Sequence, residues 1–247
     1  MQARDQSVAI VGAGDFIGSA IAEKFASEGF SVFAGRRDGS KLASLAERIG
    51  ANGGRLEARS VDARKEESVT AFLQEAEAHA PLAVCVYNIG ANVNFPILET
   101  TERVFRKVWE MACYGGFLTG REAARLMLPR KQGAIFFTGA TASLRGGVGY
   151  AAFASAKFGL RAVAQSMARE LGPSHIHVAH LIIDAGVDTA WVRQRIADRE
   201  GAEALDNLEP GRLMRPAAVA EAYWSLFQQS EDAWTFEHEI RPFAERW

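Results

Sequence analysis

The stretch SVAIVGAGDFIG (residues 7–18) decides the fold. Its first five residues are apolar and partly β-branched and run straight into glycines, which is typical of a short buried strand. Residues 15–30 follow with apolar side chains at helical spacing. A strand that passes through a glycine turn directly into a helix predicts the first half of a βαβ unit.

The same alternation continues along the chain. Further strands are predicted at residues 31–37, 54–62, 82–90, 133–140, 175–184 and 234–243, and further helices at residues 39–50, 65–80, 99–128, 149–171 and 215–229. Apolar strands joined by helices indicate a parallel sheet that is covered on both faces, with right-handed crossovers. We therefore predict an α/β fold, a Rossmann-like doubly wound parallel sheet, in one domain over residues 1–247.

Composition excludes several classes of protein. The 247 residues carry a formal net charge of −2, which gives no general attraction to nucleic acid or to an anionic membrane surface. The apolar runs are too short to span a membrane, and the N-terminus lacks the pattern of a signal peptide. Cys85 and Cys113 have no metal or redox spacing, and the histidines of residues 175–180 have no carboxylate or cysteine close by. We expect a cytoplasmic protein without a metal site.

The glycines of the opening stretch also suggest a ligand. Gly12, Gly14 and Gly18 allow a tight turn in which a pyrophosphate can approach the N-terminus of the first helix, where free N–H groups and the helix dipole favour anions. The position of the loop, first in a series of βαβ units, favours this reading. A tight turn without a ligand is the alternative.

The end of the second strand indicates which dinucleotide is bound. A carboxylate there favours NAD by accepting a hydrogen bond from the ribose 2′-OH, whereas an arginine accommodates the 2′-phosphate of NADP. Arg36 and Arg37 occupy this place, although Asp15 in the glycine loop would oppose a phosphate. We therefore predict NADP, with NAD as the alternative.

The order of these motifs resembles the classical short-chain dehydrogenase/reductase family over nearly the whole chain. VGAGDFIG is similar to the TGxxxGxG loop of that family, and YNIG (residues 87–90) is similar to NNAG. Asp62 matches an acidic residue that contacts adenine, and Thr189 matches a threonine that holds the nicotinamide carboxamide. In the family a Pro-Gly pair normally ends the sixth strand. In this sequence IDAG (residues 183–186) stands in its place. A bacterial group of the family that shares FTGATASLRGG and a WTFE…RP tail is the most similar.

The resemblance implies a nicotinamide cofactor and the residues that would hold it. These are Gly12, Gly14, Asp15, Phe16, Ile17, Gly18, Arg36, Arg37, Asp62, Ala63, Asn88, Gly90, Lys157, Asp184, Val187 and Thr189.

The catalytic residues of the family do not carry over. Its YxxxK pair becomes FASAK, which leaves Lys157 but puts Phe153 in the place of the tyrosine. The serine position falls on Ala140 and the asparagine position on Ala112. Because tyrosine is the proton donor and serine polarises the carbonyl, the standard reduction of a ketone should be severely impaired. Thr141, next to the lost serine, is the leading candidate replacement. Weaker candidates are Tyr150, Tyr114, Cys113, Asp184 and Asp188.

Three functions remain open. The first is an oxidoreductase with a rearranged proton donor or with water as the donor. The second is a reductase of iminium-type substrates that need no proton. The third is a catalytically inactive NADP-binding protein that acts as a sensor or a partner subunit.

Two further features concern the substrate and the assembly. The long, arginine-rich segment 188–216 is predicted to form a lid over the site of a small-molecule substrate. The helices that contain residues 109–127 and 153–171 correspond to those that pair in the family, so we expect a homodimer or a homotetramer. The tail from residue 234 alternates, with Trp234, Phe236, His238 and Ile240 on one face, as in an edge strand.

Overall fold

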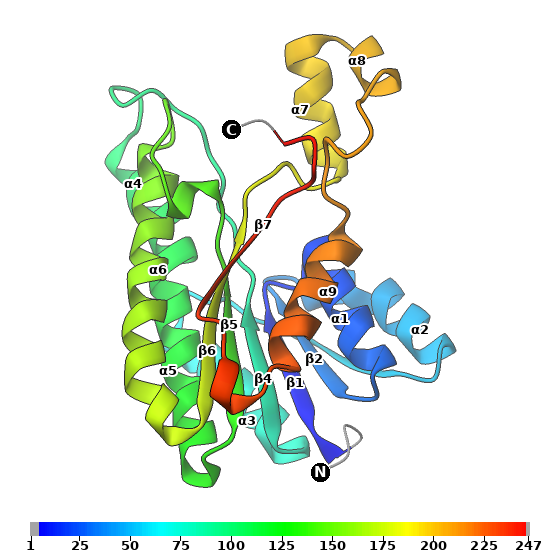
Figure 1. Cartoon of the computed structure of the whole chain (residues 1–247), viewed down its shortest axis with the longest axis vertical. Helices are drawn as coiled ribbons and strands as arrows, with labels where there is room; N and C mark the ends of the chain where they lie inside the picture. The colour runs from blue at the N-terminus through cyan, green and yellow to red at the C-terminus, as the bar shows by residue number, and fades with distance from the viewer. Residues whose placement is uncertain (1–4, 246–247) are drawn as a thin grey trace.

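The computed structural model describes residues 5–245 (Figure 1), so residues 1–4 and 246–247 of the predicted domain lie outside the described part. One seven-stranded sheet has the order β3-β2-β1-β4-β5-β6-β7, and every neighbouring pair is parallel. The strands are β1 (Ser7–Val11), β2 (Ser31–Arg36), β3 (Arg55–Ser60), β4 (Leu82–Tyr87), β5 (Gly133–Thr138), β6 (Ile176–Ile183) and β7 (Glu237–Ile240). The predicted fold class is confirmed.

Helices cover both faces of this sheet. They are α1 (Ile17–Ser27), α2 (Ala43–Ala51), α3 (Glu66–His79), α4 (Glu102–Trp109), α5 (Gly115–Met127), α6 (Ala151–Leu171), α7 (Ala190–Glu200), α8 (Glu203–Asp206) and α9 (Pro216–Phe227). Helices α1, α2 and α9 pack over one face, and α3, α5 and α6 over the other. Strands β1, β4 and β6 are buried along their whole length, as expected for a sheet covered on both sides.

The strand order reverses between β1 and β4, because β2 and β3 lie on one side of β1 and β4–β7 on the other. In open parallel sheets, ligands bind outside the carboxyl ends of the strands at such a reversal. The ends of β1, β4, β5 and β6 therefore define where a site is expected.

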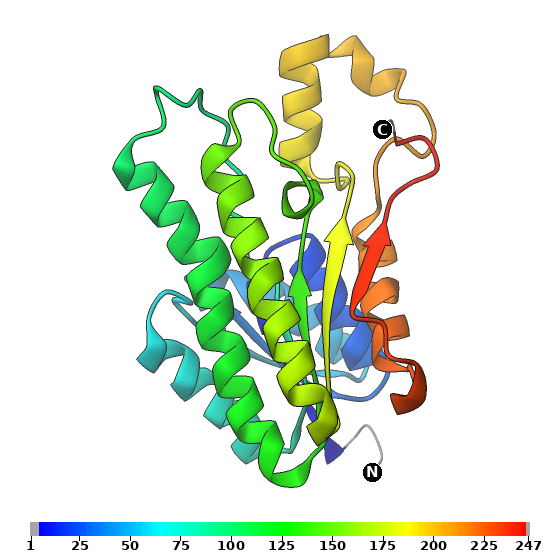
Figure 2. The same cartoon turned by 60° about the vertical axis from the view of Figure 1, so that its left-hand side comes forward.

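The predicted helix over residues 99–128 is one continuous rod with an irregular turn. Helices α4 and α5 are joined by a π-helical turn, Glu110–Tyr114, and Figure 2 shows the rod running beside α6. A π-turn leaves a backbone carbonyl without its usual helical partner. The buried Tyr87 hydroxyl donates a hydrogen bond to the Met111 carbonyl in this turn, so the turn is supported from strand β4.

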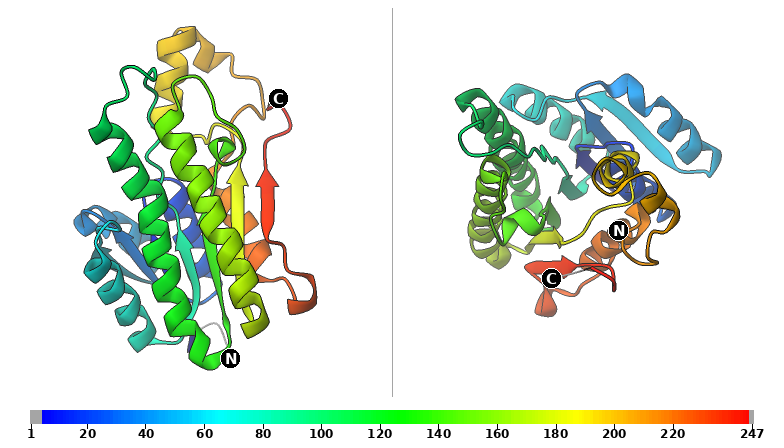
Figure 3. Two further views of the ribbon diagram at one scale, coloured as in Figure 1. Left: turned by 90° about the vertical axis from the view of Figure 1, so that its left-hand side faces the viewer. Right: turned by 90° about the horizontal axis from the view of Figure 1, so that it is seen from above.

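The predicted lid segment is more regular than its sequence suggests. It forms α7 and α8, which stand beyond the carboxyl ends of the strands and appear in front when the molecule is seen from above (Figure 3). The Thr189 hydroxyl caps α7 by accepting a hydrogen bond from the Val192 N–H at 3.1 Å. An isolated bridge between Val187 and Met214 closes the base of the segment.

The tail forms the predicted edge strand, but the predicted common face of Phe236 and Ile240 is wrong. Phe236 packs against the core under α6, whereas Ile240 packs against the core under α9. Regular strand pairing begins only at Glu237, so the alternation does not extend back to Phe236. Within residues 5–245, no helix combines the length and the apolar character that a membrane span requires.

Candidate active site

A cavity of about 710 Å³ opens at the carboxyl ends of the central strands. Its walls come from the glycine loop after β1, the ends of β4, β5 and β6, the first turns of α6, and the lid. A second cavity of about 620 Å³ lies at the ends of β2 and β3. Both cavities are lined by Gly12, Gly14, Asn88, Ile89 and Gly90, so they adjoin along the glycine loop.

Together the two cavities include every residue predicted to bind the cofactor. Twelve lie in the wall of the first cavity, and Arg36, Arg37, Asp62 and Ala63 lie in the wall of the second. Of the five predicted catalytic positions, the first cavity includes Ala140, Thr141, Phe153 and Lys157. Ala112 is fully buried in the π-helical turn and lines neither cavity.

The glycine loop has the shape of a phosphate cradle. Gly12 has a φ of +99°, and a Cβ atom there would lie 2.7 Å from the Asn88 carbonyl oxygen. A Cβ atom on Gly18 would lie 2.5 Å from the Ala13 Cα atom, so neither position tolerates a side chain. A Cβ atom on Gly14, in contrast, would meet no protein atom within 4 Å. The loop is therefore tight on its inner side and open toward the cavity.

The helix that follows the loop favours an anion. Helix α1 begins without a side-chain cap and without an acidic residue in its first turn. The first N–H groups of a helix lack intrahelical partners, and the helix dipole adds positive potential there. The loop and the helix together fit a pyrophosphate group.

Basic side chains gather at the outer end of the second cavity. Arg36, Arg37 and Lys41 all line it. The Arg36 Nη1 atom lies 2.5 Å from the Asp15 carboxylate, so Asp15 neutralises part of this charge. Among residues 5–245, no carboxylate pairs with Arg37, which is exposed. Asp38 also lines this cavity, so three basic groups stand against the carboxylates of Asp15 and Asp38, and the balance of charge still favours a phosphate at this end.

Asp62 is already engaged by a neighbour. Its two carboxylate oxygens accept hydrogen bonds from the Arg64 Nε and Nη2 atoms at 2.9 and 2.7 Å. These hydrogen bonds hold the pKa of Asp62 below its usual value. Its backbone N–H donates to the Ser68 hydroxyl at 3.1 Å.

The ends of β1, β4 and β5 are tied together by Asn88. Its side-chain nitrogen donates to the Gly12 carbonyl at 3.0 Å, and its oxygen accepts from the Thr138 hydroxyl at 3.0 Å. The Thr138 hydroxyl also lies 2.6 Å from the Tyr223 hydroxyl in α9. Asn88 therefore positions the glycine loop relative to the neighbouring strand.

Lys157 is buried in the wall of the first cavity. Its Nζ atom donates to the carbonyl oxygens of Ile89 and Thr138 at 3.1 and 2.8 Å. The Nζ atom also lies 5.8 Å from the centre of the Phe153 ring. Burial lowers the pKa of Lys157 to about 8. Its two carbonyl partners fix the ammonium group beside the position where a tyrosine would stand in the family.

The positions of the lost acid and the lost serine lie close together. Phe153 and Ala140 pack in one apolar cluster, with Ala142 and Tyr150 nearby, and both line the cavity. Neither side chain has a proton to donate. At these two positions the wall of the cavity is apolar.

Thr141 supplies a hydroxyl at the edge of that apolar patch. Its Oγ1 atom donates a hydrogen bond to the Asp184 Oδ1 atom at 2.5 Å. Asp184 follows strand β6 and is 7% exposed, and both residues line the cavity. The structure thus brings together two residues that the sequence placed in separate roles.

Other candidates have structural partners. Tyr150 precedes helix α6, and its hydroxyl accepts a hydrogen bond from the Arg195 Nη2 atom at 3.3 Å across the cavity. Tyr114 stacks on Trp109 on the outer surface of the rod, away from the cavity. The lid arginines Arg193 and Arg212 pair with Asp188 and Glu200, respectively.

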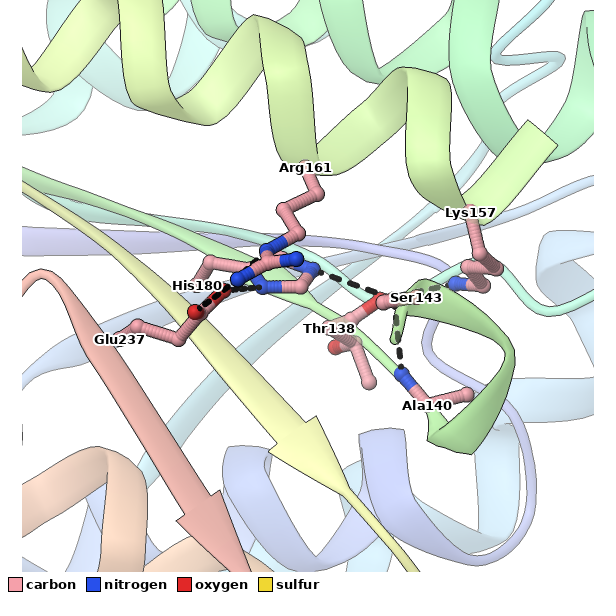
Figure 4. A network of polar contacts seen from close by, with 7 residues as sticks. All are labelled: Thr138, Ala140, Ser143, Lys157, Arg161, His180 and Glu237. Carbon is pink, nitrogen blue, oxygen red and sulfur yellow. Dashed lines mark hydrogen bonds and ion pairs between the residues drawn. The ribbon is translucent and has the colours of Figure 1, made fainter. Parts of the chain in front are cut away.

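A chain of polar contacts, buried at Ser143 and His180, supports the turn that follows Ala140 (Figure 4). The Ala140 N–H donates to the Ser143 hydroxyl at 3.2 Å, and that hydroxyl lies 3.4 Å from the His180 Nε2 atom. The His180 Nδ1 atom lies 3.1 Å from the Glu237 carboxylate, which also forms two hydrogen bonds with Arg161. The ionised Glu237 carboxylate only accepts hydrogen bonds, so we assign the imidazole proton of His180 to Nδ1. The His180 Nε2 atom then accepts a hydrogen bond from the Ser143 hydroxyl.

Burial makes this chain sensitive to acid. It lowers the pKa of His180 to about 4, although the Glu237 hydrogen bond opposes the shift, and Lys157 and Arg161 add repulsion. In the unfolded chain His180 takes up a proton near its ordinary pKa of about 6.5. Below that pH the unfolded state binds more protons, so the folded protein loses stability until the pH reaches about 4.

We expect the free energy of unfolding to fall by about 3 kcal/mol more in the wild type than in a His180→Gln variant between pH 6.5 and pH 4. Denaturant unfolding at stepped pH values measures this difference. Parallel curves for the two proteins would contradict the assignment of a neutral, buried His180.

No sequence motif pointed to several residues that lie in or beside the cavity. Arg145 lines the cavity from the loop before α6, and Glu245 lines it from the tail. Arg241 reaches Asp184 with its Nη2 atom at 3.4 Å from an Oδ2 atom. Only the alternation of the tail hinted that it lies in the sheet, and nothing in that pattern showed that it borders the site.

Comparisons with known proteins agree with this geometry. A family model described as short chain dehydrogenase matches residues 6–200. The 3-oxoacyl-(acyl-carrier-protein) reductase MabA of Mycobacterium avium is 31% identical over 229 residues, which cover 92% of this chain and 84% of that protein.

Solved structures give the same result. The crystal structure of a short-chain dehydrogenase from Rhodopseudomonas palustris is 64% identical, has a TM-score of 0.84 and covers 97% of this chain and 100% of its own. A structure of actinorhodin polyketide ketoreductase with NADPH is 25% identical, has a TM-score of 0.88 and covers 98% of each chain. The protein therefore belongs to the short-chain dehydrogenase family of oxidoreductases.

Proposed function

We propose that this protein is an NADP-dependent oxidoreductase that interconverts a carbonyl group and an alcohol at a non-standard active site. The observation that carries the proposal is the first cavity, which joins the open side of Gly14 to Lys157 and to the Thr141–Asp184 pair. When bound, the cofactor supplies or accepts the hydride. The residues of the chain hold it, orient the substrate and handle the proton.

The choice of NADP rests on the outer end of the second cavity. Arg36, Arg37 and Lys41 offer positive charge there, and Asp15 cancels only part of it. The structural relative actinorhodin polyketide ketoreductase was solved with NADPH, in agreement with this choice. Gly14 and the first turn of α1 would hold the pyrophosphate.

The other end of the cofactor would lie beside Lys157 and Thr189. The Lys157 ammonium group uses two of its three protons on backbone carbonyls, which leaves one for a ribose hydroxyl. Thr189 accepts a hydrogen bond from the Val192 N–H and keeps its own proton for a carboxamide oxygen.

The substrate would lie between the lid and the apolar patch of Phe153 and Ala140. Phe153 cannot act as an acid, and Ala140 cannot polarise a carbonyl oxygen. Loss of a general acid typically lowers the rate by about 10²- to 10⁴-fold, and loss of one oxyanion donor by about 10²- to 10³-fold. A replacement proton donor is therefore required for efficient turnover.

We also propose a homodimer or homotetramer that pairs through α4, α5 and α6. Four aromatic side chains on these helices are each about two-fifths exposed, namely Phe105, Trp109, Phe117 and Phe158. Large half-exposed aromatic side chains gathered on adjoining helices are typical of an interface.

The test is turnover by the wild type. NADPH oxidation is followed with acetoacetyl-CoA, which resembles the 3-oxoacyl class of the relatives, with 9,10-phenanthrenequinone, an activated diketone, and with 1-pyrroline, a cyclic imine. We expect substrate-dependent oxidation with a carbonyl probe. Turnover of 1-pyrroline alone would support an iminium reductase instead, and NADPH binding without any turnover would support an inactive NADP-binding protein.

A further inference from the structure

The proton donor that replaces tyrosine can be sought among the groups that border the apolar patch. Thr141 directly follows Ala140, and its Oγ1 atom lies 2.5 Å from the Asp184 carboxylate. Both residues line the same cavity as Phe153 and Lys157. A hydroxyl that touches a carboxylate can receive a proton on one side while it passes one on the other.

The backbone around Thr141 is held firmly. Thr141 opens a short 3₁₀ turn, Thr141–Ser143, whose Ser143 N–H donates to the Ala140 carbonyl at 2.7 Å. The Ser143 hydroxyl accepts from the Ala140 N–H and continues into the His180–Glu237–Arg161 chain (Figure 4). The hydroxyl of Thr141 is therefore presented from a turn that is fixed to the sheet.

Asp184 is anchored from the opposite side. Its N–H donates to the Ile240 carbonyl at 3.0 Å, and its Oδ2 atom lies 3.4 Å from Arg241. Arg241 also forms an ion pair with Glu239. One carboxylate oxygen thus faces the tail, and the other receives the Thr141 hydroxyl.

Further charged groups surround this carboxylate. Glu245 lines the same cavity, and burial raises its pKa, with the charge of Asp184 as a further cause. Arg145 and Arg212 act on Glu245 in the opposite direction. Asp184, Glu245 and several arginines therefore lie together at the end of β6.

We propose that Thr141 and Asp184 form the proton-transfer pair of this active site. The inference rests on the proposed function and names the group that the function requires. During reduction, as the carbonyl carbon gains its hydride, the carbonyl oxygen takes the proton of the Thr141 hydroxyl. The Thr141 oxygen takes the proton of the Asp184 carboxyl group, and the resulting carboxylate takes a proton from solvent.

Oxidation runs in the reverse direction. The alcohol proton passes to the Thr141 oxygen while the Thr141 proton passes to the Asp184 carboxylate. The hydrogen bond from Thr141 to Asp184 is the arrangement that this direction requires at its start. Thr141 touches the substrate in this scheme, and Asp184 acts through Thr141.

The experiment compares Thr141→Val, Thr141→Ser and Asp184→Asn with the wild type, using NADPH and the carbonyl probe that the wild type turns over. We expect Thr141→Val and Asp184→Asn each to lower kcat by about 10²- to 10³-fold, the usual range for losing a general acid. Thr141→Ser should retain at least about a tenth of the wild-type kcat, because it keeps the hydroxyl group that transfers the proton.

Two readouts separate this role from a structural one. NADPH affinity, measured by fluorescence titration, should stay within about threefold of the wild type in Thr141→Val, because the Thr141 hydroxyl bonds to Asp184 and not to the glycine loop. The pH profile of kcat should lose one limb in Asp184→Asn while Thr141→Ser keeps it.

The outcomes distinguish the two proposals. If the wild type turns over a carbonyl probe and both Thr141→Val and Asp184→Asn match its kcat, the pair is not the proton donor, although the proposed function stands. If the wild type binds NADPH and turns over no carbonyl probe, the proposed function fails, and this inference fails with it.

Discussion

A variant that carries both Phe153→Tyr and Ala140→Ser should reduce acetoacetyl-CoA with NADPH at least about 100-fold faster than the wild type. The tyrosine would place a phenol in the wall of the cavity, close to the Lys157 ammonium group, which lies 5.8 Å from the Phe153 ring. A nearby positive charge lowers the pKa of a phenol and makes it a better acid near neutral pH. The serine adds a donor for the carbonyl oxygen.

Two matched controls sharpen this result. Phe158→Tyr adds a phenol on the same helix at a side chain that is 41% exposed and lies outside the cavity wall, so it should give no gain. Adding Lys157→Met to the double variant should remove most of the gain. If the double variant gains no more than Phe158→Tyr while it still binds NADPH, the cavity does not bring a carbonyl substrate to position 153.

The second large effect concerns the glycine loop. Gly14→Val should weaken NADPH binding by about 10- to 100-fold without lowering the melting temperature, because its side chain would enter the space that the pyrophosphate needs. A Cβ atom at Gly14 would meet no protein atom within 4 Å, so the substitution adds its bulk on the side of the open cavity. Fluorescence titration and thermal unfolding of the same sample measure both quantities.

Gly12→Ala is the matched comparison. Its Cβ atom would lie 2.7 Å from the Asn88 carbonyl oxygen at a φ of +99°. Strained backbone and overpacking should destabilise the folded protein by about 2–4 kcal/mol. Unchanged NADPH affinity in Gly14→Val would show that the cofactor does not approach this loop.

The fold was largely predictable because its signals are local. Buried parallel strands leave short apolar runs such as Ser7–Val11, and the helices between them repeat at regular spacing. The glycine loop was predictable for the same reason, since a tight turn before a helix requires glycine at Gly12 and Gly18. The prediction that alternate residues of the tail share one face failed at Phe236, because regular pairing of β7 with β6 begins only at Glu237.

The candidate site was less predictable because its important contacts join distant segments. Thr141 and Asp184 are 43 residues apart. The sequence pointed to Thr141 as a replacement for the lost serine and to Asp184 as a cofactor-binding residue, but nothing in it showed that the two side chains meet. Arg241 and Glu245 reach the site only because β7 adds to the edge of the sheet beside β6. The departures at Phe153 and Ala140 and the candidate hydroxyl of Thr141 were visible from motif position alone, whereas the contact between Thr141 and Asp184 required the structure.

The most direct test of the account is a fluorescence titration of the purified wild type with NADPH and NADH. We predict saturable binding of both nucleotides or of NADPH alone, with NADPH bound at least about 10-fold more tightly, because Arg36 and Arg37 line the cavity in which we propose that the 2′-phosphate lies. Binding of neither nucleotide, or tighter binding of NADH, would contradict it.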